Sequence, residues 1–313
     1  GGQDFNGLDS FLWTGSDGNS FSDDVVAANI TVNPVNDAPD LEAGPNATVT
    51  EGQTLNRNLS IGDPDADTRQ ITVDYGDGSS PVVFTSASAS PSISHAYGAE
   101  GVFTVTVTVD DQSGAANAVE VDTFQVTVAN GAPDARNDTI YLSQNESSFF
   151  GDVFADNGPG MDYDPGGDPF SVTAVNGSAG LVGSQVTLPS GATVTLNSDG
   201  SFSYDNGAIF DYLGQGQVAT ETLTYEITDD GGLTDTATVT FRVTGANDAP
   251  DAADDTFAGV SGSSFSGNVI GAAGGGADTD PDQNAVLTVT ELDGVGASVG
   301  VQVTLGSGAL LTL

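Results

Sequence analysis

Short loops rich in aspartate are the part of this sequence best suited to chemistry. They read DPDAD at residues 63–67, DYDPGGD at 162–168 and DTDPD at 278–282. Aspartates two residues apart in a loop turn their side chains toward a common centre. Carboxylate oxygens are the ligands that Ca²⁺ prefers, and the ion takes roughly six to eight of them in flexible geometry. The spacing therefore predicts calcium sites at these loops.

A proline-containing linker recurs three times beside these loops. It reads NDAPD at 36–40 and at 247–251, with the variant NGAPD at 130–134. The proline ends strand pairing and restricts the residue before it to extended geometry. The asparagines and aspartates of the linker are further candidate ligands. Since Gly131 stands where the other copies have aspartate, we expect fewer linker carboxylates, and correspondingly fewer ions, at the middle junction.

Strict alternation of apolar and polar residues identifies the elements that must hold these loops. VFTVTVTVDD at 102–111 and TDTATVTFRV at 234–243 place valine and phenylalanine on one face and threonine on the other. This period of two is typical of half-buried antiparallel strands. Clusters of Gly, Asn, Asp and Ser separate the strands, and no segment has a helical period. The sequence predicts an all-β protein of tandem, immunoglobulin-like or cadherin-like antiparallel β-sandwiches, arranged like beads on a string.

Internal repeats set the expected domain boundaries. Residues 170–196 recur at 287–313, and DARNDT at 134–139 recurs as DAADDT at 251–256, both with a spacing of 117 residues. Residues 10–18 and 27–39 align with 222–230 and 239–250, which places Trp13 at the core position of Tyr225. The expected organisation is the C-terminal strands of a truncated sandwich at 1–36, complete sandwiches at 37–130 and 131–247, and the N-terminal part of a further sandwich at 248–313.

This pattern has two interpretations. The sequence is a window from a longer tandem array, or the tail of one chain is completed by the head of the next.

Residues 37–130 resemble the polycystic kidney disease (PKD) domain. The matching features are Asp63–Pro64, the GDG turn at 76–78, His95 with Tyr97, Gly101, and the strand at 103–110. The usual Trp and Phe around the GDG strand are replaced here by Val73 and Tyr75. The resemblance implies a β-sandwich in which His95 packs beside a strand rather than acting in catalysis.

Residues 131–247 resemble the VCBS and cadherin-like repeats of giant bacterial surface proteins. The matching signatures are DGSFSYD at 199–205, FDYLGQGQ at 210–217, LTYEITDDGG at 223–232 and TATVTFRVTGANDAP at 236–250. The resemblance implies an extracellular array of domains that bind calcium.

In an immunoglobulin-type sandwich, the B–C loop and the F–G loop lie at the same end as the preceding linker. Each candidate site therefore combines three segments that are distant in sequence. Carboxylates held together repel one another unless a cation neutralises them, and calcium is the predicted cation. Aspartate and asparagine are also ordinary turn residues, which explains Asp229 and Asp230 without an ion. The candidate ligands are Asn36, Asp37, Asp40, Asp63, Asp65, Asp67, Asp110 and Asp111 for the first sandwich, Asn130, Asp134, Asp138, Asp162, Asp164, Asp168, Asp229 and Asp230 for the second, and Asn247, Asp248, Asp251, Asp278, Asp280 and Asp282 for the third.

The composition argues against several classes of function. Four Lys and Arg against 44 Asp and Glu give a net charge of −40, which disfavours nucleic acid as a partner. There is no cysteine and only one histidine, so a thiolate metal site or a Ser-His-Asp site is hard to build and no enzyme is expected. No apolar run is long enough to insert into a membrane.

We expect a structural repeat region of a large secreted or cell-surface fibre or adhesin, stiffened by calcium at its domain junctions. The expected partners are neighbouring domains, identical chains in a filament, and glycans or cell-surface proteins. Two alternatives stay open. One is an accessory carbohydrate- or protein-binding module of a secreted enzyme, and this alternative would require an exposed row of aromatic residues. The other is a filament subunit in which residues 1–36 of one chain complete 248–313 of another.

Overall fold

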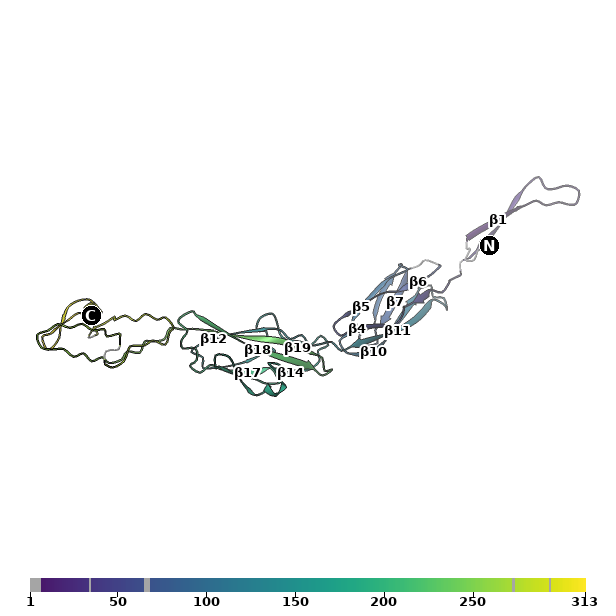
Figure 1. The fold of residues 1–313 in the computed structure, drawn as a ribbon. Coiled ribbons are helices and arrows are strands. Elements are labelled where there is room, and N and C mark those ends of the chain that lie inside the picture. The colour runs from purple at the N-terminus through teal and green to yellow at the C-terminus, as the bar shows by residue number, and fades with distance from the viewer. Residues whose placement is uncertain (1–6, 34, 65–67, 272–273, 293) are drawn as a thin grey trace. The chain divides into compact units, whose positions relative to one another are not determined.

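The computed structural model describes residues 7–33, 35–64, 68–271, 274–292 and 294–313, and its regular secondary structure is almost entirely β-strand (Figure 1). This confirms the predicted all-β class of tandem antiparallel sandwiches. The chain divides into two compact units. The first unit contains Gly1–Gly131 together with Pro165–Gly167, and the second contains Ala132–Asp164 and Asp168–Leu313.

The first unit contains one complete sandwich. Its larger sheet has the strand order β4 (Ala47–Thr50), β11 (Val119–Ala129), β10 (Gly101–Asp110), β7 (Arg69–Asp74) and β8 (Val82–Ser86). The smaller elements are the antiparallel pairs β3 (Asp40–Glu42) with β6 (Ser60–Gly62) and β5 (Thr54–Asn58) with β9 (Ser92–Ala96). Ile71 and Val73 of β7 and Val105, Val107 and Val109 of β10 are fully buried in the core, as the alternation predicts.

His95 packs within this sandwich, between an aromatic ring and the GDG turn. Its ring stacks on Tyr75 with centroids 4.0 Å apart, and its Nε2 lies 2.6 Å from Oδ2 of Asp77 in the GDG turn. Partial desolvation opposes ionisation of Asp77, but hydrogen bonds from Ser79 and His95 outweigh it and lower the pKa of Asp77 to about 2. The GDG turn is thus tied to β9 through the histidine that the PKD resemblance singled out.

The second complete sandwich lies in the second unit. One sheet has the order β12 (Asp138–Ser143), β19 (Thr234–Thr244), β18 (Val218–Asp229) and β14 (Phe170–Val175), and the other has β13 (Ser148–Asp152), β17 (Ser201–Asp205), β16 (Thr193–Leu196) and β15 (Gln185–Thr187). A short 3-10 turn, η1 (Ala179–Leu181), follows β14. Leu223, Tyr225 and Phe241 fill the core between the two sheets.

The two flanking segments carry fewer paired strands. Residues 7–32 form a hairpin of β1 (Gly7–Trp13) and β2 (Val26–Val32), and 248–313 contain the short 3-10 turn η2 (Gly296–Ser298) and the strands β20 (Val303–Thr304) and β21 (Leu310–Leu311). Trp13 is 51% exposed, so the expectation that it lies in a core is wrong for this structure. The reason is that β1 and β2 pair with each other alone, whereas the equivalent strands β18 and β19 lie between two others. In the part of the chain that the structure describes, no helix has the length and apolar character needed to span a bilayer.

Candidate metal centre

The linker before the first complete sandwich contacts the F–G loop, as predicted. The side-chain amide of Asn36 donates to Oδ2 of Asp111 at 2.8 Å, and Asn117 donates to the carbonyl of Asn36 at 3.1 Å. Desolvation opposes ionisation of Asp111, but hydrogen bonds from the Ser113 N–H and from Asn36 outweigh it and lower the pKa of this carboxyl. Two of the three predicted segments therefore meet at this end of the sandwich.

The third predicted segment, the B–C loop, contains a buried ion pair. The Nε of Arg69 lies 3.0 Å from Oδ2 of Asp63, and the side chains are 4% and 0% exposed. Sequence reasoning missed Arg69, which supplies a positive counter-charge to Asp63 from within the chain. Asp65 and Asp67 lie outside the described residues.

The other candidates of this end are more exposed. Asp37 is half-buried, and its carbonyl accepts a hydrogen bond from Asn36. Asp40 begins β3 on the surface, and Asp110 accepts the N–H of Gln112 at 2.7 Å.

Two candidates of the second sandwich are buried around one tyrosine. The hydroxyl of Tyr225 lies 2.7 Å from Oδ2 of Asp162 and 3.2 Å from Oδ2 of Asp138. The backbone N–H of Arg136 donates to Oδ1 of Asp162 at 2.7 Å, and Asn157 donates to Oδ1 of Asp138 at 3.0 Å. These two aspartates thus fasten the linker and the B–C loop to the core strand β18.

Burial is the main cause of the raised pKa values of Asp138 and Asp162. Desolvation raises the pKa of Asp138 to about 6, helped by the nearby charge of Asp162, and it also raises the pKa of Asp162. A carboxyl whose pKa lies higher in the folded than in the unfolded protein favours folding at low pH. Because the ordinary value is 3.8, this contribution is complete below about pH 4 and is lost as the pH rises through 6.

An Asp138→Asn variant should therefore gain stability relative to the wild type as the pH rises. The elevated pKa of Asp138 lowers the free energy of unfolding of the wild type by roughly 3 kcal/mol at pH 7 and by little at pH 4. Denaturant unfolding of the full chain in EDTA at pH 4.5 and pH 7 measures the difference. Asp156→Asn, at an exposed aspartate of the same sandwich, is the control. An Asp138→Asn effect that is equal at the two pH values would contradict the assignment.

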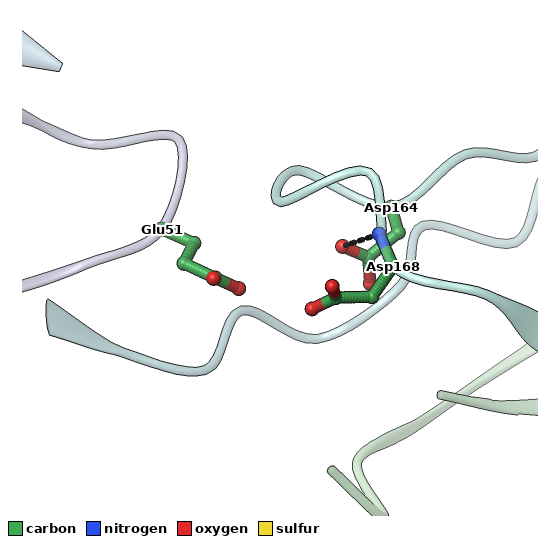
Figure 2. Close-up of side chains that lie close together, drawn as sticks. All are labelled: Glu51, Asp164 and Asp168. Carbon is green, nitrogen blue, oxygen red and sulfur yellow. Dashed lines mark hydrogen bonds between the residues drawn. The ribbon is translucent and has the colours of Figure 1, made fainter. Parts of the chain in front are cut away.

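Three further candidates of the second sandwich, Asp134, Asp164 and Asp168, lie in the linker and the B–C loop. Asp134 pairs with Tyr163 through backbone hydrogen bonds of 2.8 and 3.2 Å, and its carboxylate accepts the guanidinium of Arg136 at 3.2 Å. The N–H of Asp168 donates to Oδ1 of the buried Asp164 at 3.3 Å (Figure 2). Asp134, Asp162, Asp164 and Asp168 thus belong to one continuous arrangement of linker and B–C loop.

The F–G loop of this sandwich forms a conventional turn. Oδ1 of Asp229 accepts the N–H of Leu233 at 2.7 Å, and Asp230 is exposed. Asp229 therefore stabilises a turn, which is the role that the sequence allowed for Asp229 and Asp230 without an ion. Asn130 lies in the first unit, directly after β11, and is half-buried.

The third copy repeats the linker and B–C loop arrangement. The N–H of Ala253 donates to Oδ1 of Asp278 at 2.8 Å, as Arg136 does to Asp162, and Asp251 pairs with Thr279 as Asp134 pairs with Tyr163. The N–H of Asp248 donates to Oδ2 of Asp282 at 3.2 Å, which brings the linker directly to the loop. Asp280 accepts the N–H of Asp282, and Asn247 donates to the carbonyl of Asp248.

Two residues that sequence reasoning missed occupy equivalent places in the complete sandwiches. Glu51 follows β4 and Gln144 follows β12, the strands that pair in parallel with the last strand of each sandwich. The N–H of Glu51 donates to Ala129 and the N–H of Gln144 donates to Thr244, both at 3.0 Å. Each residue is 2% exposed, so both are buried at the end of the sandwich from which the next linker leaves.

Both side chains contact that linker. Oε2 of Glu51 accepts the N–H of Gly131 at 3.2 Å, and Nε2 of Gln144 donates to Oδ2 of Asp248 at 2.9 Å. The two sandwiches thus place the negative charge differently. After the first sandwich, the strand end supplies the carboxylate (Glu51) and the linker has Gly131 at the matching position. After the second sandwich, the strand end has the uncharged Gln144 and the linker supplies the carboxylate (Asp248). The expectation of fewer linker carboxylates at NGAPD is thereby offset by a carboxylate from the preceding strand.

Some side-chain oxygens at these strand ends and in the following loop lack a hydrogen-bond partner among the described residues. Oε1 of Glu51, Oε1 of Gln144 and Oδ1 of Asp282 are buried and have no hydrogen-bond partner among the described residues. A buried oxygen without a donor or a cation is unfavourable. Carboxylate and amide oxygens are hard ligands that suit calcium, so the donor set fits the ion that the sequence predicted.

Comparison with solved structures found similar β-sandwich proteins of low sequence identity. The PKD domain of an M14-like peptidase from Thermoplasmatales archaeon SCGC AB-540-F20 is 23% identical, with 30% of this chain and 99% of that chain covered and a TM-score of 0.23. Drosophila N-cadherin EC1-4 is 19% identical over 79% of this chain and 61% of that chain, with a TM-score of 0.28. The sialic acid binding region of a Streptococcus sanguinis SK1 adhesin is 12% identical over 70% and 81%, with a TM-score of 0.23.

Comparison with curated proteins found no match. Family models match two parts of the chain. Residues 36–128 match the PKD domain, and residues 130–245 match the bacterial cadherin-like domain. The resemblance to VCBS repeats stays a prediction. The chain therefore contains a PKD domain followed by a bacterial cadherin-like domain.

Proposed function

We propose that this chain is a structural repeat region of a large extracellular fibre or adhesin, in which calcium at the domain junctions fixes neighbouring sandwiches. PKD and bacterial cadherin-like domains are usually extracellular and non-catalytic modules, which supports a structural role. The proposed domains are those inferred from the sequence, at 1–36, 37–130, 131–247 and 248–313. Their proposed partners are neighbouring sandwiches, identical chains, and glycans or cell-surface proteins.

The observation that carries the proposal is the pair of buried side chains at the strand ends. Glu51 and Gln144 each contact the following linker while one side-chain oxygen has no hydrogen-bond partner among the described residues. We propose that Glu51 and Gln144 are calcium ligands, and that Asp248 and Asp282 act together with Gln144. With the ion bound, linker, strand end and B–C loop are held by one centre. Without it, their carboxylates repel one another and the linker is released.

Calorimetric titration of the EDTA-treated full chain tests the proposal. We expect saturable calcium binding with a dissociation constant of about 10⁻⁴–10⁻³ M, the range of extracellular modules. Magnesium at the same ionic strength is the control, because it demands a smaller octahedral site and releases water reluctantly. Heat that never saturates, or an equal response to both ions, would show that calcium only screens the surface charge.

A further inference from the structure

Arg136 joins the linker of the second sandwich to the B–C loop of the same sandwich. Its Nε and Nη2 lie 3.4 and 3.2 Å from Oδ2 of Asp134, and its Nη1 donates to the carbonyl of Pro159 at 3.3 Å. The guanidinium carbon also lies 4.9 Å from the centre of the Tyr163 ring. A carboxylate, a carbonyl and an aromatic ring thus fix one positive charge where the two acidic segments meet.

The same positive charge acts on a second, buried carboxylate. Desolvation raises the pKa of Asp162, and both the backbone N–H and the charge of Arg136 oppose this rise. A side chain added to Gly160 would collide with Nη1 of Arg136, so this glycine leaves the space that the guanidinium occupies. Arg136 is therefore a counter-charge for Asp134 and Asp162 that the sandwich carries itself.

The third copy has the same backbone contacts without the arginine. Ala253 aligns with Arg136 at the repeat of 117 residues, and its N–H donates to Asp278 as that of Arg136 does to Asp162. One Arg and two Asp give DARNDT at 134–139 a charge of 1 − 2 = −1, whereas three Asp give DAADDT at 251–256 a charge of −3. Residues 247–282 contain no Lys or Arg. The linker and the B–C loop of the third copy therefore supply no positive side chain of their own.

The first sandwich also supplies a cation at its B–C loop, but from another element. Arg69, the first residue of β7, lies 3.0 Å from Asp63, and both side chains are buried. Both complete sandwiches thus hold an arginine against an aspartate of the B–C loop or its linker. Since the two arginines come from different positions in the sandwich, they share only their charge and the acidic residues that they contact.

We propose that Arg136 takes the place of a calcium ion between the linker and the B–C loop of the second sandwich. The guanidinium neutralises Asp134 and Asp162 and connects the two segments without metal. Where Ala253 stands instead, the corresponding carboxylates repel one another until a cation from solution binds. The residue at this one position thus decides whether the connection depends on calcium. The inference rests on the proposed function for the identity of the ion.

Equilibrium dialysis of the EDTA-treated full chain counts the calcium ions bound and so tests the inference. Arg136→Ala should bind one more calcium ion per chain than the wild type, and Ala253→Arg should bind one fewer. Calcium is raised to about 10 mM, which is tenfold above the weak end of the range for extracellular modules. Salt at about 0.15 M screens the exposed charges beyond roughly 8 Å.

Three control variants separate the position from the net charge and from the shape of the side chain. Arg242→Ala removes the same charge from an exposed residue of β19, and Ala258→Arg adds the same charge at an exposed residue of the third copy. Both should bind the wild-type number of ions. Arg136→Lys keeps the charge but loses the planar fork, and it should also bind the wild-type number.

Thermal unfolding gives a second measurement on the same variants. In EDTA, Arg136→Ala should unfold at a lower temperature than the wild type, and calcium should raise this temperature more in Arg136→Ala than in the wild type. An increase of equal size in both proteins would contradict the exchange of arginine for calcium.

Three dialysis results would overturn the inference. The first is an unchanged number of ions in Arg136→Ala. The second is an extra ion in Arg136→Lys, because side-chain shape and not charge would then decide. The third is a loss in Ala258→Arg equal to that in Ala253→Arg, because net charge alone would then set the binding. The proposed function fails in a different way, through a wild type that binds no calcium, and Arg136→Ala should gain its ion even then.

Discussion

Glu51→Gln should weaken calcium binding at the junction after the PKD domain by roughly tenfold, because ligand charge sets much of the affinity of a calcium site. The same variant should be more stable than the wild type in EDTA. It replaces a buried carboxylate, whose Oε1 has no hydrogen-bond partner among the described residues, with an uncharged amide. The substitution therefore stabilises the metal-free protein and destabilises the calcium-bound one.

Calorimetry and thermal unfolding, each with calcium and with EDTA, measure this reversal. Gln144→Glu is the matched variant at the equivalent position of the other complete sandwich. It should raise calcium affinity at its own junction and lower stability in EDTA. Glu100→Gln, at an exposed position of the PKD domain, removes the same charge from the surface and should change neither quantity. If Glu51→Gln lowers stability equally with and without calcium, Glu51 has a packing role and is not a ligand.

Arg69→Met should destabilise the PKD domain by about 3–5 kcal/mol, because removing one partner of a buried ion pair leaves the other charge uncompensated. The side chain of Asp63 is 0% exposed beside Arg69, which is 4% exposed. Calcium should reduce the loss, since Asp63 is one of the predicted ligands at this end of the domain. Denaturant unfolding in EDTA and in calcium gives both values.

Two further variants make this test specific. Arg242→Met changes an exposed arginine on β19 and should stay within about 0.5 kcal/mol of the wild type. Arg69→Met combined with Asp63→Asn should recover much of the loss, because neither charge is then buried alone. A loss for Arg69→Met below about 1 kcal/mol in EDTA would mean that the buried ion pair contributes little to stability.

The strands of both complete domains were predictable because their signal is local. Val105, Val107 and Val109 alternate with threonines, and this alternation alone assigns them to the core face of β10. The same reasoning failed for Trp13, since alternation identifies an apolar face but not the segment that covers it. Whether a strand is buried depends on pairing partners, which for β18 are β14 and β19.

The candidate centre was predictable only in part, for a similar reason. Aspartates spaced two residues apart pointed to the B–C loops, and the structure brings Asp248 to Asp282 and Asp134 to the loop at Tyr163. Glu51 and Gln144 carry no such spacing. They contact linkers that are 80 and 104 residues away in sequence, and only the fold brings those positions together. Glu51 and Gln144 are recognisable as equivalent because each follows a strand, β4 or β12, that pairs in parallel with the last strand of its own sandwich.

Small-angle X-ray scattering of the full chain tests most directly whether calcium fixes the junctions. The measurement is made in calcium and after EDTA, with circular dichroism to follow the strands. The account predicts that chelation changes the maximum dimension and broadens the distance distribution while the circular dichroism spectrum is unchanged. An unchanged maximum dimension would contradict the claim that calcium stiffens the array.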